Sequence, residues 1–355
     1  MQAKPRHGFF LGGRTLALAT VNGFLITAFV GCTSTPISVE TEYLFQGPTM
    51  GTAYRVKVIS PHLSDAGKSR IDQAIRRELD NVNAKMSTYQ ADSEISRFNR
   101  QRTIEPFPLS VDVIEVLSEA QRISEATEGA FDITVGPLVD AWGFGPVKLD
   151  RIPSESRLAK LRQSVGWEKI EIGAPATARK SHPATQADLS AIAKGYAVDR
   201  VSQTLADLDY GNHMVEVGGE VRTAGHGPTG SAWRIAIEQP TLGHRAQQGI
   251  VLLNEGAMAT SGDYRNFIEK DGVRYSHTID PRSARPVTHR LTSVTVIHLS
   301  CMTADAYATA LMVMGEDEAF RFATAHDLAV MLLVRGEEGD FTERCTPAFE
   351  AFRRS

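Results

Sequence analysis

Four segments of the sequence carry glycine, polar and aromatic residues where a plain hydrophobic core would carry aliphatic ones. They lie at residues 50–52, 86–99, 129–145 and 188–199. In the last segment, small residues precede an apolar periodic run, and the free N–H groups of such a helix start can hold a phosphate. That segment contains neither GxxxxGK[ST] nor GxGxxG, so it is no Walker loop and no Rossmann fingerprint. In the second, Tyr89 just beyond a helix can stack on a flat ring, with ordinary rim packing as the alternative.

The elements that must position these segments follow from hydrophobic periodicity. Alternating β-branched residues predict a strand over 52–59. Ser64 and Ser110 each precede an apolar run at spacings of three and four, which predicts two capped helices, the second ending near Gly129. We expect further helices over 191–208 and 303–314, and strands over 214–217, 233–238, 249–254, 293–299 and 328–334. Several consecutive strands without intervening helices favour antiparallel sheets, hence an α+β fold.

Composition narrows the class of protein further. The 355 residues are 42% hydrophobic and 23% charged, which is typical of a globular protein. The formal charge of −4 lacks the basic excess of a nucleic-acid binder, so we expect no nucleic-acid partner. No two histidines stand at helical spacing for a metal, which argues against a zinc site. No repeat or second linker follows residue 48, so we predict one continuous catalytic body over residues 48–345.

The N-terminus reads as a secretory signal. Basic residues precede an uncharged, mostly apolar run over 15–30, shorter than the about 20 residues of a spanning helix. Small residues before Cys32 resemble a bacterial lipobox, so we predict a signal peptide at 1–31, a lipidated Cys32 and a flexible tether at 32–47. An uncleaved anchor is the alternative. A secretory signal implies an oxidising compartment, in which Cys301 and Cys345 could pair. We nevertheless expect two free thiols rather than a disulfide.

Together the four segments resemble the ApbE-type FAD:protein FMN transferases, flavin transferases of the bacterial envelope. The resemblance spans about residues 48–335 and continues in order through Val217-Gly218-Gly219-Glu220-Val221, Thr260-Ser261-Gly262-Asp263-Tyr264, His277-Thr278-Ile279-Asp280-Pro281 and Ala304-Asp305-Ala306-Tyr307-Ala308-Thr309. It implies a T-fold-like architecture, mostly antiparallel sheets flanked by helices. One departure is visible, because the family usually has Thr-Gly after the Asp-Pro pair, where this chain has Ser283-Ala284.

The resemblance also implies a reaction. FAD binds with Mg²⁺, FMN is joined through its phosphate to a threonine hydroxyl of a partner flavoprotein, and AMP leaves. Asp305 and Thr309, four residues apart near a helix start, share one helix face and offer the oxygen ligands that Mg²⁺ prefers. The backbone carbonyl of Ala193 completes the metal ligands by match to the family. Compensation of the helix dipole is the plainer role for Asp305.

The remaining roles come from the same resemblance. His277 and Asp305 are the candidate catalytic residues, and His277 would take the threonine proton, since imidazole titrates near neutral pH. A lone histidine beside Asp-Pro is as readily structural. Lys194 would offset pyrophosphate charge, with exposure to solvent as the alternative. The candidate FAD-binding residues are Met50, Tyr89, Ala130, Phe131, Asp132, Ser190, Lys194, Tyr196 and Ile279.

Two other functions remain open at this stage. With water as acceptor, the same site gives an FAD pyrophosphatase that releases FMN and AMP. Without chemistry, the chain is a flavin-binding lipoprotein that stores or delivers FAD. For the transferase, the resemblance implies acceptors in membrane redox complexes, such as sodium-pumping quinone reductases and electron-transport complexes. It also implies a periplasm-facing protein held on the bacterial membrane by its lipid.

Overall fold

The computed structural model describes residues 40–145, 152–240, 247–262, 267–270, 273–337 and 339–353. They all belong to one compact unit, Val39–Ser355. The predicted signal peptide, Cys32 and the first part of the predicted tether lie outside the described residues. Among the residues that are described, we find no helix with both the length and the apolar character needed to cross a membrane.

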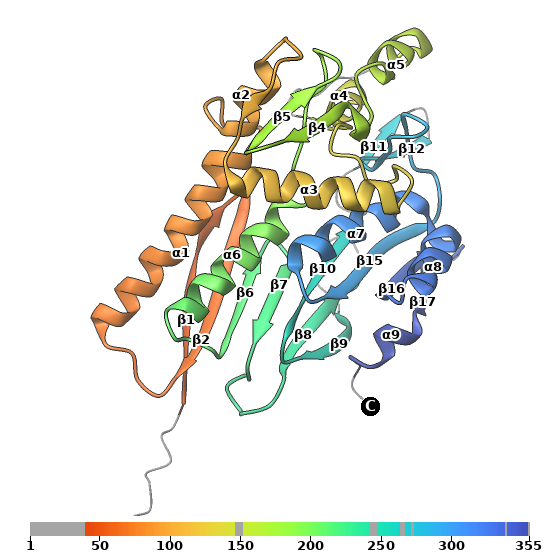
Figure 1. The fold of residues 1–355 in the computed structure, drawn as a ribbon. Coiled ribbons are helices and arrows are strands. Elements are labelled where there is room, and N and C mark those ends of the chain that lie inside the picture. Colours follow the sequence, from red (N-terminus) through yellow and green to blue (C-terminus); the bar gives the residue numbers. More distant parts are fainter. Residues whose placement is uncertain are drawn as a thin grey trace, which may run out of the picture. The chain divides into compact units, whose positions relative to one another are not determined.

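A large antiparallel sheet organises the unit (Figure 1). Every neighbouring pair of its strands runs antiparallel, which confirms the expected α+β class. Within the described residues, its eight strands are in spatial order β1 (Thr41–Thr49), β2 (Thr52–Ser60), β6 (His213–Val217), β7 (Glu220–Ala224), β10 (Gly256–Gly262), β15 (Leu291–His298), β16 (Ala329–Arg335) and β17 (Phe341–Cys345).

Smaller sheets and helices surround it. The short strands form three further hairpins and one three-stranded sheet in the described part: β8 (Trp233–Glu238) with β9 (Gln247–Leu253), β11 (Phe267–Lys270) with β12 (Val273–Ser276), β13 (Ile279–Asp280) with β14 (Arg285–Pro286), and β3 (Phe107–Pro108) with β5 (Thr177–Lys180) and β4 (Ile170–Gly173). The α-helices are α1 (Asp65–Met86), α2 (Glu94–Arg100), α3 (Val111–Ala126), α4 (Gly136–Ala141), α5 (Glu155–Arg162), α6 (Ala193–Asp207), α7 (Cys301–Met314), α8 (Glu316–Ala325) and α9 (Pro347–Glu350).

The two faces of the large sheet bury different cores. On one face, alternate strand residues such as Val215, Val294 and Leu332 join a core with helices α1, α3, α6 and α7. On the other, Met331 and Leu333 join a smaller core with the β8–β9 hairpin and Phe349 of α9. The alternation follows from the two-residue period of a strand. Helices α6 and α7 therefore lie directly on the sheet, α6 over β6 and β7 and α7 over β10 and β15 (Figure 1).

Serine hydroxyls cap three of the four helices that the sequence predicted. Ser64 accepts a hydrogen bond from the N–H of Gly67, and Ser110 accepts one from Val113, as the capping pattern indicated. Ser300 caps α7 through the N–H of Thr303, so this helix begins two residues earlier than expected. The predicted strands at 52–59, 214–217, 233–238, 249–254, 293–299 and 328–334 are all present; the strand at 233–238 has the predicted bounds, and the others have shifted ends.

The catalytic body begins earlier and ends later than predicted. Residues 41–47, predicted as tether, belong to the edge strand β1, so that prediction is wrong for these residues. Gly47 and Pro48 are residue types that are rare in strands, so the sequence does not indicate a strand here. In the structure, β1 pairs with β2 along its whole length and buries Phe45. At the other end, α9 follows residue 345. Cys301 and Cys345 are free thiols, as expected.

Candidate active site

A pocket of about 670 Å³ opens at one end of helices α1 and α6. This volume is within the range of about 300–1,000 Å³ for sites that bind small molecules. Five of the residues predicted from the sequence to act at the site line it: Met50, Tyr89, Ser190, Ala193 and Lys194. The rest of its lining consists of Gly51, Val82, Asn83, Met86, Ser87, Thr88 and Gln90. Three segments far apart in the sequence therefore meet at one cavity.

Met50, an apolar residue of the pocket lining, has an unusual backbone conformation. Met50 and Gly51 form the two-residue turn between β1 and β2, because Thr49 pairs with Thr52. Both positions of this turn have positive φ, 48° at Met50 and 70° at Gly51, and this conformation is uncommon outside glycine. Fixing a long, apolar side chain at this corner presents it to the pocket.

Tyr89 also lines the pocket, with 77% of its surface exposed. The loop that carries it is tied down, since the hydroxyls of Ser93 and Ser96 both donate to the carbonyl of Ser87, at 2.6 and 3.2 Å. A large aromatic ring left in solvent on an ordered loop is suited to stacking against a planar ligand.

Three charged side chains meet at Lys194, which lines the pocket at the start of helix α6. Lys194 Nζ lies 3.0 Å from Glu220 Oε1 and 3.6 Å from Asp305 Oδ2. Both carboxylates are nearly buried, with 5% and 7% of their side chains exposed, whereas Lys194 keeps 28% and also lines the pocket. Two carboxylates and one ammonium give this cluster a net charge of −1 when all are ionised.

The electrostatics of the cluster favour an additional cation. Burial opposes the charge of Lys194, but Asp305 and Glu220 outweigh it and hold the pKa of Lys194 above its ordinary value. Burial also raises the pKa of the Glu220 carboxyl, although Lys194 works against that shift. Glu220 Oε2 is buried and has no hydrogen-bond partner among the described residues. An unpaired buried carboxylate oxygen is costly, so the site accommodates positive charge readily.

Helices α6 and α7 approach each other so closely here that only glycine fits. A Cβ on Gly195 would lie 2.3 Å from the carbonyl oxygen of Cys301. The same glycine donates its N–H to Asp305 Oδ2 at 3.1 Å. Helix α6 has no side-chain cap of its own, and Asp305 satisfies one of its first N–H groups. The contact holds Asp305 of α7 against the first turn of α6, the turn that begins with Ala193.

The residues here fit a magnesium ion of the kind expected from the sequence. Asp305 supplies a carboxylate, Thr309 follows one turn later on α7 and is partly buried, and Ala193 brings a backbone carbonyl. These are hard oxygen donors, and Mg²⁺ commonly takes one or two carboxylates together with water and substrate phosphates. No cluster of three or more histidine, cysteine or acidic residues able to hold a metal occurs in the described part of the chain. The ion's other ligands would have to be hydroxyl, carbonyl, water and phosphate.

Other predicted residues do not line the pocket. Ala130 and Phe131 are buried at 1% and 2% exposure, and Ile279 packs in a separate core with Leu138 and Trp142. Tyr196 is buried, and its hydroxyl donates to Asp112 Oδ1 at 3.0 Å. Phe131, Tyr196 and Ile279 each have packing partners that explain their positions without a ligand.

Asp132 is likewise directed at its own backbone. Its Oδ1 accepts hydrogen bonds from the N–H and the hydroxyl of Thr134, both at 2.7 Å. Burial raises the pKa of Asp132 from 3.8 to about 6, against these two hydrogen bonds. A raised pKa favours the folded state at acidic pH, and this contribution is lost as the pH rises through about 6.

His277 lies between β12 and β13, with its ring 6.4 Å from that of Phe144 in an edge-on contact. His277 is not part of the pocket lining. Strand β13, which begins two residues later, packs against α7. The turn beyond β13 contains Ala284 at φ 61°, the position where the family usually has glycine. Hydrogen bonds to Asp280 and Trp142 hold that turn in place. Asp263 and Tyr264 of the preceding motif lie outside the described residues.

Sequence reasoning gave Glu220 no role of its own. It directly follows the turn Gly218-Gly219, in which both residues have positive φ. Glu220 is therefore the first residue of β7. Its strand position alone does not reveal that it faces Lys194 of α6. The signal in the sequence that could have identified it is an acidic residue directly after a glycine pair.

Comparison with known proteins places this fold among flavin transferases. The flavin transferase ApbE of Vibrio cholerae superposes with a TM-score of 0.81 at 44% identity, over 88% of this chain and 99% of that one. The flavinyl transferase ApbE of Pseudomonas stutzeri, in its apo form, gives 0.81 at 37% identity, over 89% and 98%. A histidine-to-glycine variant of the Vibrio protein has also been solved.

Sequence comparison agrees. An FAD:protein FMN transferase of Vibrio cholerae is 46% identical over 308 residues, covering 86% of this chain and 91% of that protein. One of Haemophilus influenzae is 44% identical over 318 residues, covering 88% and 92%. The model of the ApbE family matches residues 50–332. The chain belongs to the ApbE family.

Proposed function

We propose that this protein is an FAD:protein FMN transferase whose reaction depends on Mg²⁺ and whose acceptor is a threonine hydroxyl. The observation that carries the proposal is the position of Lys194, which lines a pocket suited to a flavin and also contacts Asp305 and Glu220. A dinucleotide whose isoalloxazine lies between Met50 and Tyr89 would then bring its pyrophosphate to the charged cluster.

The step is a phosphoryl transfer. The threonine oxygen forms a bond to the FMN phosphorus, the bond from that phosphorus to the bridging oxygen breaks, and AMP leaves with the electron pair. Such transfers depend mainly on alignment and on neutralisation of charge. When bound, Mg²⁺ would neutralise the charge that develops on the phosphate oxygens. Asp305, Thr309 and the carbonyl of Ala193 would hold it, Lys194 would bind the pyrophosphate, and Ser190 would contact the nucleotide.

We assign the threonine proton to His277. The support is that an imidazole can act as a general base and that the nearby strand β13 packs against α7. Ala130, Phe131, Asp132, Tyr196 and Ile279 remain candidates for flavin contact only if FAD extends beyond the described pocket lining.

Release of AMP tests the proposal. The protein is incubated with FAD, Mg²⁺ and an acceptor domain that bears a threonine, and AMP is measured by chromatography. We expect chelation of the metal and the Asp305→Asn substitution each to lower the rate by at least about 100-fold, since each removes charge neutralisation from the transition state. Unchanged AMP release from Asp305→Asn removes Asp305 from the metal site.

We further propose that Cys32 carries the lipid that anchors the mature protein to the bacterial membrane, facing the periplasm, where acceptor flavoproteins of membrane redox complexes are found. The support is the sequence before Cys32. Metabolic labelling with a fatty acid should mark the native chain and not a Cys32→Ser variant. Equal labelling of the two chains contradicts the anchor.

A further inference from the structure

Two charged connections run from strand β7 through helix α6 to helix α7. Glu220 and Arg222 are two residues apart on β7, so they share one face of the sheet, the face on which α6 and α7 lie. The first connection is Glu220 to Lys194 to Asp305, described above. The second begins with Arg222, which lies 2.5 Å from Asp199 Oδ1 on α6.

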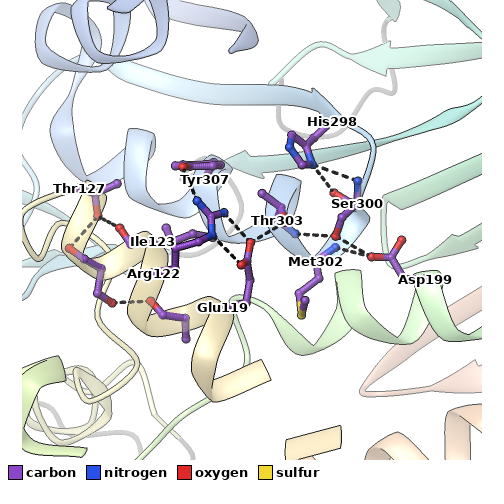
Figure 2. Close-up of polar contacts among 12 residues, drawn as sticks. Glu119, Arg122, Ile123, Thr127, Asp199, His298, Ser300, Met302, Thr303 and Tyr307 are labelled. Atoms are coloured by element: carbon purple, nitrogen blue, oxygen red, sulfur yellow. Dashed lines mark hydrogen bonds and ion pairs between the residues drawn. The ribbon is translucent and has the colours of Figure 1, made fainter. Parts of the chain in front are cut away.

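Asp199 carries the second connection into the start of α7. Its Oδ1 accepts the N–H of Cys301 and its Oδ2 the N–H of Met302, both at 3.0 Å, and Oδ2 also accepts the hydroxyl of Ser300 at 2.9 Å. Figure 2 shows this carboxylate directed at Ser300 and Met302. These N–H groups belong to the first turn of α7 and have no partner within the helix. Asp199 therefore fixes where α7 begins.

The two helices thus cap each other. Asp199, one turn after Gly195 on α6, holds the first N–H groups of α7, while Asp305, one turn into α7, holds the N–H of Gly195. With the start of α7 fixed, the helical rise fixes the position of Asp305 and Thr309. A shift of α7 would move both of its oxygen donors away from the carbonyl of Ala193 together.

Helix α3 supports α7 from another side. Figure 2 shows Glu119 accepting a hydrogen bond from the Thr303 hydroxyl, at 2.6 Å, while Arg122 joins Glu119 to Tyr307. Thr303 and Tyr307 are one turn apart and lie on a different face of α7 from Asp305 and Thr309. This contact resists rotation of α7, whereas Asp199 fixes its position along the axis.

We propose that Asp199 is a positioning residue for the magnesium site: through the start of α7 it sets the separation of Asp305 and Thr309 from Ala193. The inference rests on the proposed metal site, and it assigns Asp199 no contact with metal or FAD. Loss of an outer partner of metal ligands typically lowers metal affinity about 10–100-fold. We therefore expect Asp199→Asn, which loses the ion pair to Arg222 and one anionic acceptor oxygen, to raise the half-saturating Mg²⁺ concentration at least tenfold.

The test measures metal binding directly. Mg²⁺ is titrated by calorimetry into the full chain with FAD bound, and FAD binding is followed separately by quenching of flavin fluorescence. The matched control is Asp207→Asn, the same substitution at the exposed end of the same helix. A second variant, Arg222→Met, keeps the Asp199 carboxylate and breaks only its ion pair, and it replaces Asp199→Asn if that variant does not fold.

A weaker Mg²⁺ isotherm in Asp199→Asn or Arg222→Met, with FAD affinity unchanged and Asp207→Asn equal to the native chain, supports the proposal. A Mg²⁺ isotherm equal to the native one, with loss only in the free energy of unfolding, overturns it and makes Asp199 purely structural. If the native chain itself binds no Mg²⁺, the proposed metal site fails and this inference fails with it. The native titration therefore separates the two.

Discussion

The close approach of α6 and α7 predicts a large effect from one methyl group. In Gly195→Ala the new Cβ would lie 2.3 Å from the Cys301 carbonyl oxygen, although real Cβ atoms keep at least 3.0 Å, so the helices must separate by about 0.7 Å. Overpacking of this kind costs about 1–3 kcal/mol. Alanine's better helix propensity returns about 1 kcal/mol. The free energy of unfolding should therefore fall by up to about 2 kcal/mol.

The effect on catalysis should be larger than the effect on stability. Separation of the helices stretches the 3.1 Å hydrogen bond from Gly195 to Asp305 and moves Asp305 away from Ala193. Displacements of about 1 Å can lower rates about 100-fold, so we expect a loss of about 10–100-fold in FMN transfer at fixed Mg²⁺.

Urea denaturation and initial rates of AMP release measure the two effects on the same sample. The control is Gly211→Ala, because a Cβ there meets nothing within 4 Å, and it should change stability by no more than about 0.5 kcal/mol. A Gly195→Ala protein that is as stable and as active as the native chain would refute the argument that these helix starts must touch for the site to form.

Two further predictions concern the pocket rim and a buried acid. Tyr89→Ala should weaken FAD binding by about tenfold and relieve quenching of flavin fluorescence, since a stacked base or ring contributes about 1–3 kcal/mol; equal quenching contradicts stacking. Asp132→Asn should raise the free energy of unfolding at pH 8 by up to about 3 kcal/mol, from about 1.36 kcal/mol per unit of pKa shift. The native chain should lose stability as the pH rises from about 4 to 6, and urea midpoints of the variant across that range should not show this loss. A loss of the same size in the variant would assign the pH dependence to other groups.

Local sequence patterns predicted most helices and strands well, because the start of a helix or strand depends on residues that are close in the sequence. Ser64 and Ser110 mark helix starts since capping uses N–H groups only three residues away. Strand β1 was missed because its evidence is the pairing with β2, which the composition of Thr41–Thr49 does not display. An edge strand with one neighbour needs little hydrophobic alternation.

The site was predictable only in part for the same reason. The family motifs identified Lys194 and Asp305, and the structure brings them together. Their connection to Glu220, and the contacts from Asp199 to the start of α7, join residues on different elements, and no spacing in the sequence records them. Conversely, Tyr196 is in a motif, yet it is buried and its hydroxyl donates to Asp112 at the start of α3. Motif membership does not separate residues that touch a ligand from residues that hold the motif in place.

The most direct test of the central claim is the mass of the acceptor. The chain from Thr33 onward is incubated with FAD, Mg²⁺ and a threonine-bearing acceptor domain, and the intact acceptor is weighed. We predict a gain equal to one FMN phosphoester, equimolar AMP, and the loss of both when Mg²⁺ is chelated or the acceptor threonine is replaced by alanine. Release of AMP and free FMN with no gain in mass on any acceptor contradicts the transferase and identifies a pyrophosphatase, and FAD that stays bound and intact identifies a carrier.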